Sequence, residues 1–139
     1  MVAPVTHEDL MDTLGARIDT ILEPLLPTDI TIMYSNQEMP TTLSDPWMKV
    51  NIQHGGNFQA DIGTANHRYR RMGRILFQCF GKLHVGTESL NQLVAHIEAV
   101  FRGQKVDSVN YITPDVIDRG RNGKYYELDV SCPFWVDVF

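Results

Sequence analysis

Two segments of the chain repeat their apolar residues at the three- and four-residue spacing of an amphipathic helix. The first begins at Thr6, a favourable N-cap residue, and ends where Pro24 and Pro27 interrupt it. The second follows Thr87 and ends at Gly103. We therefore predict two helices, and their apolar stripes are Leu10, Leu14, Ile18, Ile21 and Leu22 in the first, and Leu90, Leu93, Val94, Ile97, Val100 and Phe101 in the second.

Five other segments have the alternation, or the β-branched and aromatic enrichment, that is typical of strands. They are 30–34, 47–53, 73–80, 106–112 and 126–133. The segment 73–80 is apolar at nearly every position, which predicts a central strand. In the last segment Glu127 and Asp129 alternate with apolar residues, so we interpret them as the solvated face of a half-buried strand.

Two connections are long and polar. Residues 55–72 form a long excursion, read as an extended hairpin or a loop, and residues 113–124 are predicted to be an exposed loop with a turn at Asn122 and Gly123. Connections of this length inside a domain are more often functional than idle.

The order of elements predicts an α+β fold with one domain over residues 1–139, as the length also favours. We expect a mostly antiparallel sheet of about four to five strands with both helices on one face. Hydrophobic residues make up 43% of the chain, enough for a core, which excludes general disorder.

The composition limits where the protein works. No stretch approaches the roughly 20 apolar residues of a membrane span, and the first residues lack the pattern of a secretory signal. Cys79 and Cys132 are too few and too far apart for a disulfide scaffold, so we expect buried, reduced thiols in a cytoplasmic setting.

The net charge of −5 is unevenly distributed. Residues 1–65 contain nine acidic and two basic side chains, whereas residues 66–139 contain eight acidic and ten basic ones. This division suits contacts with copies of the chain or with charged protein partners, and it disfavours a dedicated nucleic-acid binder.

Catalytic and metal-binding motifs are not found. The five histidines, at positions 7, 54, 67, 84 and 96, do not pair at the short spacings of a metal site, and Glu127 and Asp129 lack the lysine of a metal-dependent nuclease. We predict no enzyme activity, no cofactor and no metal.

Basic and apolar residues late in the chain are the candidates for an interface. Arginines beside Tyr69 could hold phosphates and stack bases, or could form a basic interface loop or a solvated rim. The apolar end of the chain is either a paired last strand or a patch that a neighbouring subunit covers. The candidate interface residues are Arg68, Tyr69, Arg70, Arg71, Arg74, Arg119, Arg121, Lys124, Trp135 and Phe139.

Several segments together resemble the tail terminator, or tail completion, proteins of long-tailed bacteriophages. They are the early helix, Asp29 to Pro40 with Asn36-Gln37, Trp47-Met48-Lys49-Val50, Arg71-Met72-Gly73-Arg74-Ile75, the helix ending in Phe101-Arg102-Gly103, and the strand from Tyr126 to Phe134. The chain departs from the family where relatives often have a proline before the second helix, since Gly81 to Gly86 stands there instead.

The resemblance implies a small α+β structural protein of the virion, made in the host cytoplasm. Such proteins form a homohexameric ring on the head-proximal end of the tail tube, stop its polymerisation and offer a surface to the head. The implied partners are copies of the chain, the tail tube protein and a head completion or neck protein, with DNA passing through the lumen. The alternatives are another neck or minor tail component, or a small nucleic-acid-binding module that uses Arg68 to Arg74.

Overall fold

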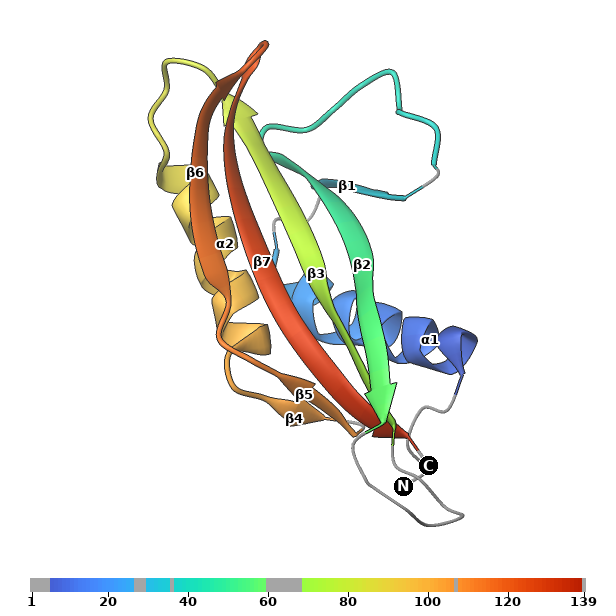
Figure 1. Cartoon of the computed structure of the whole chain (residues 1–139). Helices are drawn as coiled ribbons and strands as arrows, with labels where there is room; N and C mark the ends of the chain where they lie inside the picture. The colour runs from blue at the N-terminus through green and yellow to red at the C-terminus, as the bar shows by residue number, and fades with distance from the viewer. Residues whose placement is uncertain (1–5, 27–29, 36, 60–68, 107, 139) are drawn as a thin grey trace.

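The computed structural model describes residues 6–26, 30–35, 37–59, 69–106 and 108–138. They form one α+β domain in which two helices cover a curled, mostly antiparallel sheet of seven strands (Figure 1). The helices are α1 (His7–Arg17) and α2 (Glu88–Phe101). The strands are β1 (Thr31–Tyr34), β2 (Trp47–Gln59), β3 (Tyr69–Lys82), β4 (Lys105–Val106), β5 (Val109–Tyr111), β6 (Asp115–Asn122) and β7 (Tyr125–Val138).

Both predicted helices are present. The Thr6 Oγ1 accepts the Asp9 N–H at 3.1 Å and so caps α1. After α1 the chain continues through a π-helical turn, Ile18–Leu22, and a 3-10 turn, Glu23–Leu25, before it leaves the helical path. Gly103, with φ of +61°, follows α2 in the left-handed conformation that a glycine adopts without strain.

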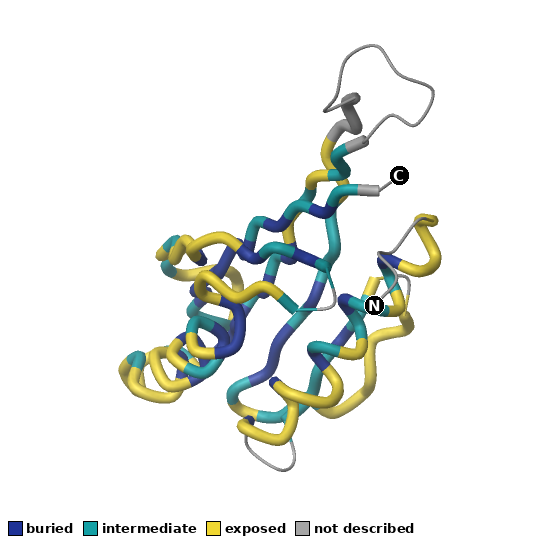
Figure 2. The backbone as a smooth tube through the Cα atoms, turned by 90° about the horizontal axis from the view of Figure 1, so that it is seen from below, coloured by how far each residue is buried: buried dark blue, intermediate teal, exposed yellow. Residues whose placement is uncertain are grey.

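The core lies between the helices and one face of the sheet. Figure 2 shows buried residues along the central strands and on the inner sides of the helices, whose outer turns are exposed. The predicted stripes are buried as expected, except that Ile21 is 42% exposed. Ile21 lies in the π-helical turn, where the wider spacing keeps Ile18 and Leu22 on the core side and turns Ile21 outward.

The sheet order is β1-β2-β3-β7-β5-β4, and β6 also pairs with β7. The strand β3 is central, as predicted, between β2 and β7. The short β1 lies parallel to residues Trp47 to Val50 of β2, and the other pairs are antiparallel.

The excursion predicted over 55–72 is an extension of the β2–β3 hairpin where the structure describes it. The ladder continues past a bulge between His54 and Asn57, and Gln59 pairs with Tyr69. Gly55 therefore does not end the strand, because the bulge absorbs the extra residue. Residues 60–68 of this segment lie outside the described part of the chain.

Two predictions about strands were wrong, so the count of four to five was too low. The segment 113–124 is not an exposed loop, because Asp115–Asn122 forms β6 and pairs with β7. As an edge strand β6 is exposed at most positions on both faces, so its sequence shows no alternation. The predicted strand 106–112 is two short strands, β4 and β5, on either side of Ser108 with φ of +68°.

The last strand continues beyond Pro133, where the prediction ended it. On one side of β7 the partner changes from β6 to β5 around this proline, and the Ile112 N–H donates to the Pro133 carbonyl at 2.9 Å. A proline is tolerated here because β7 changes its neighbour from β6 to β5 at this position, so no backbone N–H of residue 133 is needed for pairing on that side. The buried Phe134 and Val136 then pair with β5, which confirms the interpretation of this segment as a paired strand.

Within the described residues, no helix is both long and apolar enough to cross a membrane.

Candidate assembly surfaces

The face of the sheet turned away from the helices, which we call the outer face, carries most of the charged strand residues. It begins near the buried cluster of Met33, Trp47 and Phe80, against which Leu43 packs from the β1–β2 connection. Its members follow from alternation and register and are Trp47, Lys49, Asn51 and Gln53 in β2, Arg70, Met72, Arg74, Leu76, Gln78, Phe80 and Lys82 in β3, and Tyr125, Glu127, Asp129, Ser131, Pro133, Trp135 and Asp137 in β7.

Glu127 and Asp129 are buried on the outer face, at 5% and 2% exposure, so their interpretation as a solvated face was wrong. Side chains of β6, which pairs beside β7 in the sheet, reach both carboxyl groups. The bulge of β6 between Asp118 and Gly120 brings the Arg119 Nε to 3.0 Å from the Asp129 Oδ2. Polar side chains from two strands complete the cluster: Asn122 Nδ2 lies 2.7 Å from one Glu127 oxygen, and Gln78 Nε2 lies 3.3 Å from the other.

Glu127 and Asp129 lie two residues apart on the same face of β7, and both carboxyl groups are buried. Burial raises the pKa of Asp129 to about 6, the neighbouring Glu127 carboxyl adds to this rise, and Arg119 opposes it. Asp129 therefore takes up a proton as the pH falls through about 6, and in the described ion pairs its cationic partner is Arg119.

We expect the protonation of Asp129 to change the free energy of unfolding with pH. Because the pKa of Asp129 is higher folded than its ordinary 3.8, the folded chain binds the proton more tightly. The free energy of unfolding should then fall as pH rises from about 4 through about 6. Urea unfolding at several pH values should show this fall for the wild type and a flatter profile for Asp129→Asn. The control is Asp115→Asn, which changes an exposed residue of β6 and should keep the wild-type slope.

The predicted basic segment of β3 does not form one patch, because alternate residues of a strand face opposite sides. Arg70 and Arg74 lie on the outer face, whereas Arg71 lies on the other. Arg70 forms a two-point ion pair with Asp137, with Nε–Oδ1 at 2.7 Å and Nη2–Oδ2 at 3.1 Å. Its guanidinium carbon also lies 4.0 Å from the centre of the Trp135 ring. Arg70 and Trp135 thus belong to one compensated cluster at the end of the sheet.

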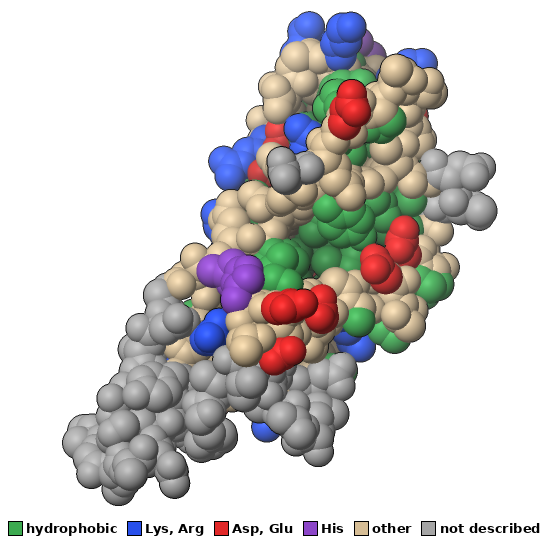
Figure 3. Space-filling view, turned by 90° about the vertical axis from the view of Figure 1, so that its right-hand side faces the viewer, with side chains coloured by type: hydrophobic (Ala, Val, Ile, Leu, Met, Phe, Trp, Pro, Cys, Tyr) green, Lys and Arg blue, Asp and Glu red, His purple; other side chains and the backbone are tan. Residues whose placement is uncertain are grey.

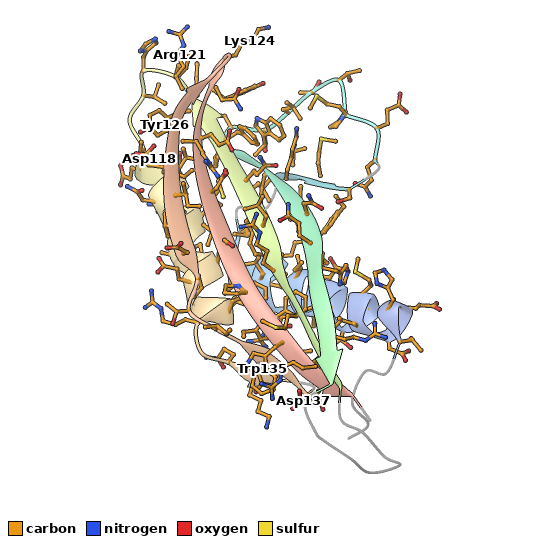
Figure 4. All side chains as sticks on the ribbon, viewed as in Figure 1. Asp118, Arg121, Lys124, Tyr126, Trp135 and Asp137 are labelled. Atoms are coloured by element: carbon orange, nitrogen blue, oxygen red, sulfur yellow. The ribbon has the colours of Figure 1, made fainter. Side chains whose placement is uncertain are left out.

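The other candidate residues divide between the two ends of the sheet. Figure 4 shows Trp135 and Asp137 at one end of β7, and Arg121 and Lys124 at the other, beside the β6–β7 turn. Arg74 donates to the Gln53 Oε1 at 2.7 Å. The Arg121 Nε donates to the Gly123 carbonyl at 3.4 Å, and Lys124 is exposed in the turn. Arg68, Phe139 and the side chain of Tyr69 lie outside what the structure describes.

Besides the outer edges of the short strands β1 and β4, two longer strand edges are open in the described residues, and they lie on opposite sides of the sheet. Within the described residues, β2 pairs with β1 only over Trp47 to Val50, so the backbone of residues 51–59 has a strand partner on one side alone. The strand β6 likewise pairs only with β7, from Asp115 to Asn122 with the bulge at Arg119. Val116 on β6 is 43% exposed. An unpaired edge offers N–H and C=O groups to a strand of another chain.

Sequence reasoning missed this pair of edges because it read β6 as a loop. A signal was present in the dipeptide Asn122-Gly123 between two segments, which is typical of the turn of a β-hairpin. Gly123 has φ of +61° in the structure, as such a turn requires.

No protein-family model and no curated protein matches this sequence significantly. The structure is similar to a solved structure that carries no functional name, with a TM-score of 0.69 and 11% sequence identity. The match covers 96% of this chain and 98% of that one. At this identity the likeness shows the fold, a single α+β domain of the same extent, and nothing about activity.

Proposed function

We propose that the protein is a structural subunit that assembles head to tail into a closed ring, and that this ring is the tail terminator of a long-tailed bacteriophage. The observation that carries the ring is the pair of open edges, β6 on one side of the sheet and residues 51–59 of β2 on the other. The strand β6 of one copy would add to β2 of the next. A continuous sheet would then run through the contact.

The difference between the edges favours a head-to-tail contact over a two-fold one. The edge at β6 carries four charged side chains, Asp115, Asp118, Arg119 and Arg121, whereas the described side chains of the β2 edge from Asn51 to His54 are uncharged amides, an isoleucine and an imidazole. Two different surfaces on opposite sides of a subunit generate a ring when the rotation between copies closes. The curl of the sheet (Figure 1) supplies such a rotation.

The terminator role rests on the resemblance of the sequence. It gives the ring its proposed partners, the tail tube protein on one face and a head completion or neck protein on the other, with DNA passing through the lumen. The two ends of the sheet suit these different partners, because one carries Arg121 and Lys124 and the other carries Trp135 with the Arg70–Asp137 pair. We propose that the two ends of the sheet, where the strands begin and end, form the two faces of the ring.

A lysine at the open edge should separate the subunits. In Val116→Lys the charge lies on β6 at a position that is already 43% exposed, so the monomer should keep its stability. We expect the concentration at which half of the ring dissociates to rise about tenfold or more, since edge lysines oppose strand addition. Native mass spectrometry over a dilution series measures this change.

The matched control is Val85→Lys, in the turn before α2, where valine is 62% exposed and lies on neither edge. It should assemble as the wild type does. Addition of the wild-type ring to a polymerising tail tube protein of the same phage should shorten the tubes. A two-fold dimer, or equal effects of the two lysines, would contradict the edge contact, and tubes of unchanged length would contradict the terminator role.

A further inference from the structure

Three metal-ligating side chains converge where α1 meets β2. His7 and Met11 lie one helical turn apart on α1, so they share a face of the helix. The ring centres of His7 and His54 are 4.5 Å apart, and the His54 Nε2 lies 3.3 Å from the Met11 Sδ. Tyr34 and Asn51 line the hollow beside them. Figure 3 shows imidazole groups at the surface on this side of the molecule, next to apolar side chains.

This donor set is unusual in combining two imidazole nitrogens with one thioether sulfur. A thioether is a soft ligand that favours Cu(I), and imidazole is also a good ligand for copper. Zinc sites are instead built from thiolate, imidazole and carboxylate ligands. We propose that His7, Met11 and His54 bind one Cu(I) ion.

The charges around the cluster favour a monovalent ion. Burial lowers the pKa of His54, and the neighbouring His7 and Arg71 lower it further. Because the Arg71 guanidinium is one of the charges that act on His54, a dication at the cluster would be repelled more strongly than Cu(I).

The fold holds the donors near one another before a metal arrives. His7 and Met11 are fixed on a helix whose Leu10 and Leu14 are fully buried. His54 precedes the bulge of β2, and bulges commonly re-aim a side chain. The strongest competing ligands in the chain, Cys79 and Cys132, are fully buried, and burial raises the pKa of Cys79 to about 12. Neither thiol presents a thiolate to the solvent.

The test is a titration of the full chain with Cu(I), kept reduced by ascorbate, against a chromogenic Cu(I) chelator. We expect one ion per chain, and at least tenfold weaker binding in Met11→Leu and in His54→Gln. The matched controls are Met39→Leu and His84→Gln, which change an exposed methionine and an exposed histidine away from the cluster. They should bind as the wild type does.

A Zn(II) titration separates a copper site from general binding by histidine. Met11→Leu should leave any Zn(II) affinity unchanged, because only the soft ion depends on the thioether. Circular dichroism should show all four variants folded, since each changes a side chain that is not fully buried. Wild-type binding no tighter than that of Met11→Leu, or equal losses in the variants and their controls, would overturn the proposal.

Discussion

Replacement of Gly73 by alanine is expected to destabilise the protein by about 3 kcal/mol, at the upper end of what added volume costs a packed core. A Cβ at this position of β3 would lie 2.5 Å from the carbonyl oxygen of Gln53 in β2 and 2.8 Å from Cζ of Phe134 in β7. The first of these atoms is backbone, so it moves only if β2 moves. The change would therefore spread the hairpin that carries the open β2 edge.

A second glycine offers a control of opposite sign. Apart from the neighbouring backbone of α1 itself, no atom lies within 4 Å of a Cβ added to Gly15, so Gly15→Ala should stabilise the protein by about 1 kcal/mol through helix propensity. Urea unfolding at one pH compares the two variants directly. If Gly73→Ala were as stable as the wild type, the close packing of Phe134 over this glycine would be wrong.

The elements that the sequence predicted correctly are those that bury one face. In α2 the apolar residues recur at helical spacing because that stripe packs against the sheet, and all six predicted core residues are buried. The strand β3 was found for the same reason, since Ile75, Phe77 and Cys79 are fully buried in the core. Burial leaves a pattern in the sequence, and the position of a neighbouring strand does not.

The elements that the sequence missed are stabilised by backbone pairing or by polar contacts. The strand β6 has an exposed residue at most positions, so only its ladder with β7 defines it. The buried Glu127 and Asp129 are contacted by side chains of β6, the strand paired beside β7, which alternation in β7 alone could not reveal. His7 and His54 are 47 positions apart and meet only through the tertiary packing of α1 on β2.

Truncation of Phe101 is expected to cost about 3–5 kcal/mol, the range for loss of a buried aromatic side chain. Phe101 ends α2 and is fully buried. Its ring centre lies 5.5 Å from that of Phe77 in β3 and 5.1 Å from that of Tyr111 in β5, the latter edge to face. Because Phe101 joins the helix to the centre and to one side of the sheet, Phe101→Ala should loosen β5 as well as lower the free energy of unfolding.

Two measurements separate this role from a general loss of apolar surface. Urea unfolding should show the full loss for Phe101→Ala and a change of less than about 1 kcal/mol for Ile112→Ala, whose side chain is 44% exposed beside β5. Hydrogen exchange should then show faster opening of the Tyr111 amide, which donates to the Gln104 carbonyl at 2.7 Å, in Phe101→Ala alone. Equal effects of the two substitutions would mean that α2 does not hold β5 in place, and the end of the sheet beside Trp135 would then depend on its strand ladder and on the Arg70–Asp137 pair.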